Sequence, residues 1–272
     1  MRRVRAAKAA GFVAPLALVA LLLSLVSCAL RAPDRSEPFD PVQSSPAQRA
    51  RIDAIGAVLA PIIAGQPSAE AKLLLELDEL YRPLTAADRA LLDEIRAQPG
   101  GEPDITIPSG VEWVRVEGQV AHTAKGDQPI PLQLVTEPVW QAFGELDQAM
   151  RKELGRGLLI GSAYRSPAYQ LYLIVEFLPR FDYSLAQTQA HVSLPGASDH
   201  NRVERLGIDF VSESGVDLEY SHAADFIALP EYRWLLANAE RFGFEPDPVA
   251  AGAPVSSPWH WRHAERRHVG RR

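Results

Sequence analysis

The stretch LPGASDHNRVERLGIDFV, residues 194–211, ends in a short apolar strand that contains one carboxylate, Asp209. A carboxylate between two apolar residues of a strand usually needs a metal ion or an ion pair. A later strand, PWHWRH, carries His260, which alternation places on the opposite face from its two flanking tryptophans. With His200 these residues offer two imidazoles and one carboxylate, a donor set that suits a hydrolytic zinc site with a fourth position for water. For Asp209 and His260 the alternative is a buried polar pair or a satisfied core histidine.

Two further stretches frame this pattern. GSAYRSPAYQ, residues 161–170, precedes it, and SPWHWRH, residues 257–263, follows it. In this order the three stretches resemble the zinc D-Ala-D-Ala carboxypeptidases, VanY-like enzymes of the lysostaphin/D-Ala-D-Ala peptidase/hedgehog group of metallopeptidases. The resemblance covers about residues 133–269, half of the chain.

This resemblance implies an α+β fold of the hedgehog/D-Ala-D-Ala peptidase kind, with a small antiparallel sheet, flanking helices and a helical N-terminal region before it. It implies Zn²⁺ as the cofactor and peptidoglycan stem peptides as the substrate. The residues that it assigns are the zinc ligands His200, Asp209 and His260, the carbonyl-polarising Arg165, and the pocket residues Ser198 and Gln170. For Arg165 the alternative is an ordinary surface arginine beside a helix start.

The sequence departs from the family pattern in two places. The interval from His200 to Asp209 is nine residues, where the family usually has about seven. The family's general base is a Glu, or sometimes a His, three residues before the last ligand, and here that position is Ser257. Serine at neutral pH is no base for a metal-bound water. The nearest candidates by sequence are Glu204 and Asp199, and we expect Glu204, in the longer interval, to replace the base. The alternative is a solvated Glu204 paired at most with Arg202 or Arg205.

Hydrophobic periodicity predicts the elements around these motifs. Helices are expected over 49–64, 68–81, 85–98, 137–154, 167–178 and 230–242, with Thr85 and Ser166 as N-caps. Short strands are expected in VEWVRVEGQV, GLLIGSAY, LGIDFV and PWHWRH. Short strands mixed with helices, without a regular βαβ rhythm, favour the α+β class.

The N-terminus has the pattern of a bacterial lipoprotein. A basic start and an apolar run lead to LVSC, which ends at Cys28, the single cysteine of the chain. We expect a signal peptide at 1–27, lipidation of Cys28, a proline-rich flexible tether at 28–48, a helical region at 49–104 and the peptidase core at 105–269. Ala29 after the cysteine favours the outer membrane over the inner, with the protein facing the periplasm. The alternative is an uncleaved membrane anchor with an incidental cysteine.

The charge of the chain limits its partners. The net charge is −6, and it falls to about −10 without residues 1–27, which carry four basic residues and no acid. This acidic body argues against nucleic acid as a partner. The sequence therefore predicts a lipid-anchored cell-envelope zinc peptidase that cleaves stem peptides at D-amino-acid bonds. Because of Ser257, a catalytically degenerate binding or regulatory module is the main alternative, and a purely structural envelope lipoprotein is a third.

Overall fold

The structure is a computed structural model that describes residues 38–218, 223–246 and 257–264. The described residues from Phe39 onward belong to one compact unit. The expected signal peptide and Cys28 lie outside the described residues. In the part of the chain that the structure describes, no helix combines the length and the hydrophobicity needed to cross a bilayer.

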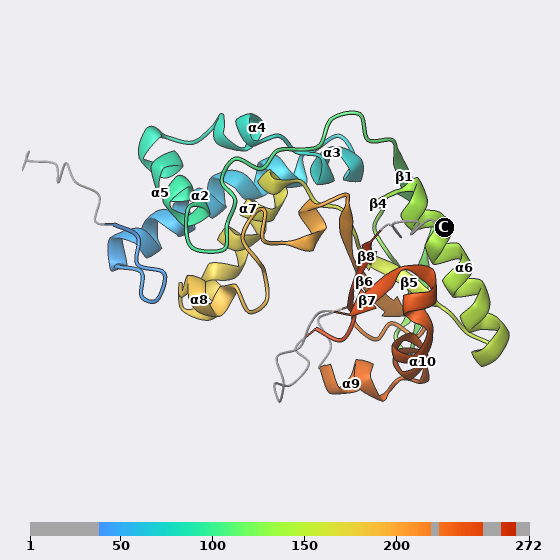
Figure 1. The fold of residues 1–272 in the computed structure, drawn as a ribbon. Helices are drawn as coiled ribbons and strands as arrows, with labels where there is room; N and C mark the ends of the chain where they lie inside the picture. Colours follow the sequence, from blue (N-terminus) through green and yellow to red (C-terminus); the bar gives the residue numbers. More distant parts are fainter. Residues whose placement is uncertain (1–37, 219–222, 247–256, 265–272) are drawn as a thin grey trace, which may run out of the picture. The chain divides into compact units, whose positions relative to one another are not determined.

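A four-stranded antiparallel sheet, drawn in Figure 1, carries the functional motifs. Its strands are β5 (Leu158–Ser162), β6 (Arg205–Ser212), β8 (His260–Ala264) and β7 (Phe244–Pro246), in that order across the sheet. β6 is buried along most of its length because it pairs on both sides, with β5 and with β8. Two smaller antiparallel pairs, β1 (Trp113–Val116) with β4 (Gln133–Thr136) and β2 (Val120–Thr123) with β3 (Gly126–Pro129), complete the strands of the described residues.

The first hydrophobic core lies between this sheet and the helices beside it. α6 (Glu137–Leu154) presents Val139, Phe143, Leu146 and Met150 to the core, with the apolar spacing that the sequence predicts. Phe210 of β6 stacks on Phe143 at a centroid distance of 5.9 Å. The shorter helices α9 (Ala223–Ala228), α10 (Pro230–Asn238) and η3 (Ala239–Phe242) contribute further members of the same core.

A second core joins the N-terminal helices to α7 (Pro167–Phe177). These helices are α2 (Pro46–Ala64), α3 (Ala69–Leu73), α4 (Leu77–Tyr81) and α5 (Ala86–Arg96), and the short η1 (Leu178–Phe181) and α8 (Leu185–Thr188) follow α7. The caps at Thr85 and Ser166 are confirmed, since each side chain accepts a backbone N–H three residues on. Ahead of α2, Phe39 is buried and its N–H donates to Glu94 at 2.8 Å, so the ordered body begins before the first described helix.

The single helix expected over 68–81 is wrong, because the structure has two helices there, α3 and α4. Leu75 is fully buried between them, and Glu76 begins the second helix with a capping box to Glu79. The rest of the architecture confirms the predicted class: an α+β fold with small antiparallel sheets and flanking helices, preceded by a helical region.

A turn after β6 places Asp217 in the left-handed region, at φ 83°. The turn is held by Ser212, whose N–H donates to Val216 O and whose hydroxyl accepts the Val216 N–H. Burial, together with the negative charge of Asp209, raises the pKa of Asp217 to about 8. Folding therefore keeps a proton on this carboxyl that the unfolded chain releases above its ordinary pKa of 3.8.

This proton makes the stability of the metal-free protein depend on pH in a defined direction. As the pH rises from about 4 to about 8, the parent should lose stability relative to the Asp217→Asn variant, because only the parent must retain a proton to stay folded. Asparagine is a suitable replacement because it tolerates the left-handed backbone. The measurement is urea unfolding of both proteins in chelator across this pH range. A difference in free energy of unfolding that stays constant with pH would contradict the assignment.

Candidate metal centre

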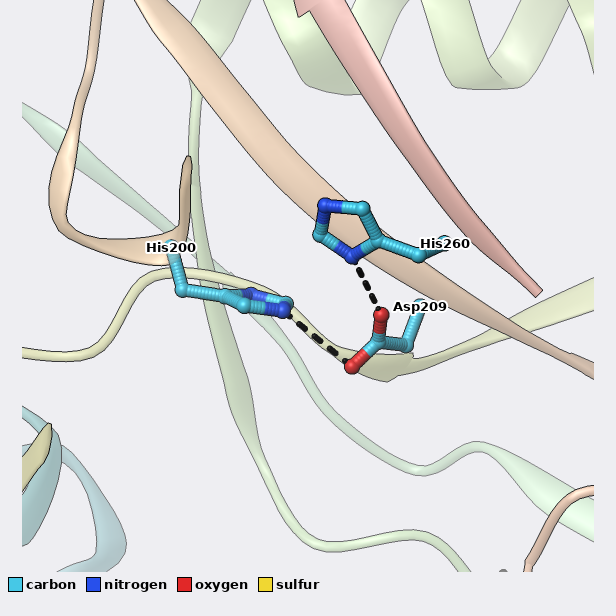
Figure 2. Close-up of side chains that lie close together, drawn as sticks. All are labelled: His200, Asp209 and His260. Carbon is cyan, nitrogen blue, oxygen red and sulfur yellow. Dashed lines mark hydrogen bonds and ion pairs between the residues drawn. The ribbon is translucent and has the colours of Figure 1, made fainter. Parts of the chain in front are cut away.

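The three predicted ligands, His200, Asp209 and His260, meet at one place (Figure 2). One potential ligand atom from each lies within 4.8 Å of the other two. Asp209 Oδ1 is 2.7 Å from His260 Nδ1, and Asp209 Oδ2 is 3.2 Å from His200 Nε2. Two imidazoles therefore turn toward a single carboxylate, which is the geometry of a group that can close around a cation.

Pairing between strands puts two of these residues together. In the antiparallel register of β6 with β8, Asp209 stands opposite His260. The backbone N–H of His260 donates to the backbone carbonyl of Ser257 at 3.0 Å, and this bond fixes the turn that leads into β8. His200 comes from the short helix η2 (Asp199–Asn201), which packs on β6.

The ring nitrogens that face away from the centre also have partners. His200 Nδ1 is 2.7 Å from the carbonyl oxygen of Ala163, and a carbonyl can only accept, so this nitrogen carries the proton. His200 Nε2 is then left with its lone pair toward the centre. His260 Nε2 faces the carboxylate of Asp199 at 3.7 Å. Metal-binding histidines usually hold their second nitrogen in this way.

The electrostatics favour the protonation states that bind a metal. Burial alone would raise the pKa of Asp209, but the neighbouring His200 and His260 outweigh it and hold that pKa well below its ordinary value. Burial, assisted by the charge of Arg165, lowers the pKa of His200. An ionised carboxylate and a neutral imidazole are the forms that coordinate metal ions. The two imidazoles and the carboxylate thus fit Zn²⁺, with room for a fourth ligand.

Arg165 lies beside this centre, as the sequence predicts. The backbone N–H of Arg165 donates to the backbone carbonyl of His200 at 2.9 Å. The backbone carbonyl of Arg165 accepts a hydrogen bond from the Asn201 side-chain amide at 2.6 Å. The guanidinium is close enough for its charge to act on His200. The segment between β5 and α7 is thereby tied directly to the helix that carries a ligand.

Ser198 and Gln170 are buried next to the loop that leads to His200. The Gln170 side-chain amide donates to the carbonyl of Ser193 at 2.7 Å, and the carbonyl of Ser198 accepts the Asn201 N–H at 3.0 Å. The Gln170 side chain therefore braces the loop, whereas the Ser198 contact is a backbone bond within the loop. The contact of either side chain with a substrate remains a prediction.

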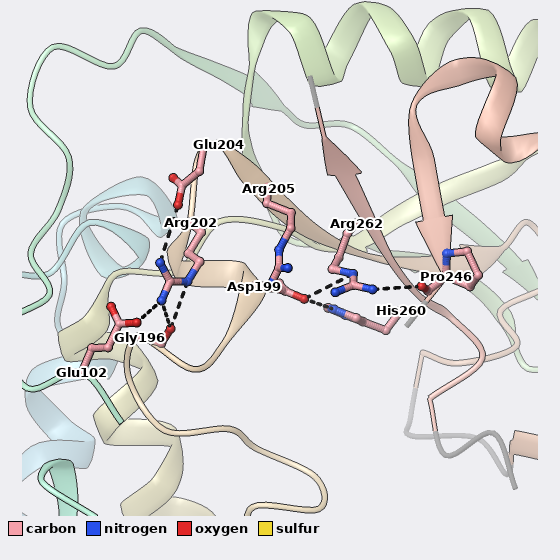
Figure 3. Close-up of polar contacts among 9 residues, drawn as sticks. All are labelled: Glu102, Gly196, Asp199, Arg202, Glu204, Arg205, Pro246, His260 and Arg262. Carbon is pink, nitrogen blue, oxygen red and sulfur yellow. Dashed lines mark hydrogen bonds and ion pairs between the residues drawn. The ribbon is translucent and has the colours of Figure 1, made fainter. Parts of the chain in front are cut away.

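Glu204 does not reach the metal centre. Its side chain is 67% exposed and lies 3.6 Å from Arg202, and in Figure 3 it points away from His260. These contacts give no support to the expectation that Glu204 replaces the missing base, and they match the solvated, arginine-paired alternative. Charged side chains in a surface turn gain more from water and a neighbouring guanidinium than from burial. Ser257 contributes the backbone carbonyl described above and leaves the base position without a carboxylate.

Three residues form part of the framework of the site, a role that the sequence did not predict for them, although Asp199 was a candidate base. Asn201 bridges two segments, because its side-chain oxygen accepts the Gly196 N–H and its amide donates to Arg165. Asp199 lies against His260, and Gly207 lies so close to both that it has no room for a side chain. Only Gly207 carried a signal, since a glycine inside a strand often marks the close approach of another group.

Comparison with known proteins supplies the family. The family of D-alanyl-D-alanine carboxypeptidases called VanY matches residues 133–266, which contain the whole centre. No curated protein matches the chain significantly.

Solved structures resemble the chain only weakly. A vancomycin-resistance D,D-pentapeptidase VanY variant in complex with Zn(II) is 21% identical over 58% of this chain and 82% of its own, with a TM-score of 0.39. The L,D-carboxypeptidase LdcB is 20% identical over 64% and 78%, with a TM-score of 0.41. DacB from Streptococcus pneumoniae is 15% identical over 59% and 85%, with a TM-score of 0.36.

These structural similarities are too low to carry an assignment, which rests on the family match and on the residues of the site. The match covers the three convergent ligands, Arg165 and the sheet that positions them. Residues 133–266 of this chain form a domain of the VanY family of D-alanyl-D-alanine carboxypeptidases.

Proposed function

We propose that this domain is a zinc-dependent carboxypeptidase that hydrolyses peptidoglycan stem peptides next to a D-amino acid. The observation that carries the proposal is the convergence of His200, Asp209 and His260 within the segment that matches the carboxypeptidase family. These residues would hold the zinc ion. When bound, zinc supplies Lewis-acid chemistry, which polarises a carbonyl and lowers the pKa of a water molecule to about 7.

In this proposal Arg165 acts on the substrate. Its backbone N–H donates to the carbonyl of His200, and its guanidinium charge contributes to the lowered pKa of His200. A guanidinium there can donate paired hydrogen bonds to the terminal carboxylate of a stem peptide or to an oxyanion as it forms. Gln170 would act one step further out, because its side chain donates to the carbonyl of Ser193 in the loop that leads to His200, and Ser198 stays a proposed pocket residue.

Proton transfer is the step for which this site is least well equipped. Ser257 offers no base, and Glu204 lies in solvent. Asp199 contacts the Nε2 side of His260, whereas the nitrogen that faces Asp209 is Nδ1, so Asp199 lies behind the ring as seen from the centre. General-base help typically contributes about 10²–10⁴-fold. We therefore infer a slow peptidase, which the family match supports over a module that only binds.

Restoring a carboxylate at residue 257 tests the proposal. Ser257→Glu should raise the turnover of peptides ending in D-Ala-D-Ala about 10²–10⁴-fold, because it supplies the base that the site lacks. Ser257→Gln is the matched control, with nearly the same shape and no basic group, and it should stay at the level of the parent. The assay is release of D-alanine by the full-length protein, with zinc content measured in parallel.

The outcomes separate the possibilities. An inactive parent whose Ser257→Glu variant is active would indicate a degenerate peptidase with an intact metal centre. Zinc-loaded parent and Ser257→Glu proteins that both fail on these peptides and on whole peptidoglycan would overturn the peptidase proposal.

We further propose that the protein is a lipoprotein of the cell envelope, attached through Cys28, with its peptidase domain on the periplasmic side and the outer membrane favoured. The support is the sequence of the N-terminus: a basic start, a short apolar run, and the single cysteine at the end of LVSC. Such an anchor would place the domain within reach of the peptidoglycan. Each buried methylene of an acyl chain contributes about 0.8 kcal/mol to membrane attachment.

Replacing the anchoring residue tests this proposal. Cys28→Ser should abolish labelling by a fatty-acid probe and leave the precursor uncleaved, because the thiol is the site of acylation. The readouts are metabolic labelling and the mass of the N-terminus in cells. A variant that is still labelled and still matured would show that the lipoprotein assignment is wrong.

A further inference from the structure

We propose that Asp199 is a positioning residue that fixes the imidazole of His260 for metal binding. This inference rests on the proposed function, since it concerns how the chain prepares the proposed zinc centre. Asp199 immediately precedes the ligand His200, so one short helix supplies one ligand and the support of another.

The geometry places the Asp199 carboxylate on the outer side of the His260 ring (Figure 3). Asp199 Oδ2 is 3.7 Å from His260 Nε2, while His260 Nδ1 faces Asp209 at 2.7 Å. A small rotation of the ring would bring Nε2 within hydrogen-bond distance of Asp199. With the proton held on Nε2, the lone pair of Nδ1 is directed to the centre.

Asp199 is itself held in place. Its carboxylate is 9% exposed and lies between two arginines from the neighbouring strands. Oδ1 accepts a hydrogen bond from Arg205 Nη2 at 2.6 Å, and Oδ2 lies 3.6 Å from Arg262 Nε. Arg262 also donates to the carbonyl of Pro246 on β7 at 3.2 Å, so three strands contribute to fixing one carboxylate. A buried carboxylate with two cationic partners keeps one orientation far better than a solvated one.

Gly207 gives independent evidence that the approach of Asp199 to His260 is built into the fold. A Cβ on Gly207 would lie 2.8 Å from His260 Cε1 and 3.1 Å from Asp199 Cβ. The absence of a side chain at this position of β6 therefore lets the ring and the carboxylate come together over the strand.

The other charged cluster of the loop does not face the centre, and it supplies a control. Arg202 pairs with Glu102 and with Glu204, and it donates to the carbonyl of Gly196 at 2.7 Å. Figure 3 shows this cluster apart from His260. Glu102 is thus an arginine-paired carboxylate beside the same loop, and its partners, Arg202, Pro195 and Ile105, are not ligands of the centre.

The test is the affinity for zinc of the full-length protein, measured by competition with a chromophoric chelator. Asp199→Asn should weaken zinc binding about 10–100-fold, the usual cost of losing a partner behind a ligand. Glu102→Gln should bind zinc like the parent. The visible spectrum of the Co²⁺ form should change in Asp199→Asn and not in Glu102→Gln, because only the former disturbs the ligand ring.

A double variant distinguishes the loss of ring positioning from an effect of the changed charge or of folding. Asp199→Asn combined with Arg205→Gln restores the balance of charge in the cluster, and it should bind zinc as weakly as the single variant. Recovery of the parent's affinity in the double variant, or an unchanged affinity in Asp199→Asn, would overturn the inference while the proposed function stands. A folded parent that binds no zinc would instead defeat both.

Discussion

The antiparallel pairing of β6 with β8 is the constraint on which the site depends. It sets Asp209 opposite His260, and the backbone ladder holds the two side chains 2.7 Å apart at their nearest atoms. A slip of one residue in this register would turn one of the two side chains to the other face of the sheet. The buried residues around β6, including Phe210 and Trp261, make such a slip costly because they would leave the core with it.

The longer interval between His200 and Asp209 contributes support rather than a base. Asn201 ties the loop to Arg165 and Gly196, Arg202 ties it to Glu102, and Arg205 reaches back to Asp199. Asn201, Arg202 and Arg205 each contact a residue outside the interval, whereas Glu204 pairs with Arg202 within it. The contacts of Asn201 and Arg205 join the segment at Arg165 and the strands around the centre, and the Arg202 cluster lies to one side of it.

The sequence predicts what depends on local pattern or on the order of motifs. The apolar spacing of α6, the caps at Thr85 and Ser166, and the convergence of His200, Asp209 and His260 could all be anticipated. The break between α3 and α4 could not, because burial of Leu75 is a tertiary effect that overrides helix periodicity.

Glu204 and Asp199 show the same limit at the site. Both are carboxylates near His200 in the sequence, and position alone does not distinguish them. In the fold, Asp199 lies buried between Arg205 and Arg262, whereas Glu204 lies at the surface beside Arg202. The two carboxylates differ because different strands pass near them. The arrangement of the sheet, and not the sequence of the loop, decides which one is buried.

If His200, Asp209 and His260 form a metal centre, the purified protein should contain metal. We expect about one zinc ion per chain at neutral pH, because three protein ligands suffice for a site of this type. His260→Ala should lose that zinc and keep its far-ultraviolet circular dichroism spectrum. A folded parent protein without bound zinc, or a His260→Ala variant that retains it with unchanged affinity, would show that these three residues do not form a zinc centre.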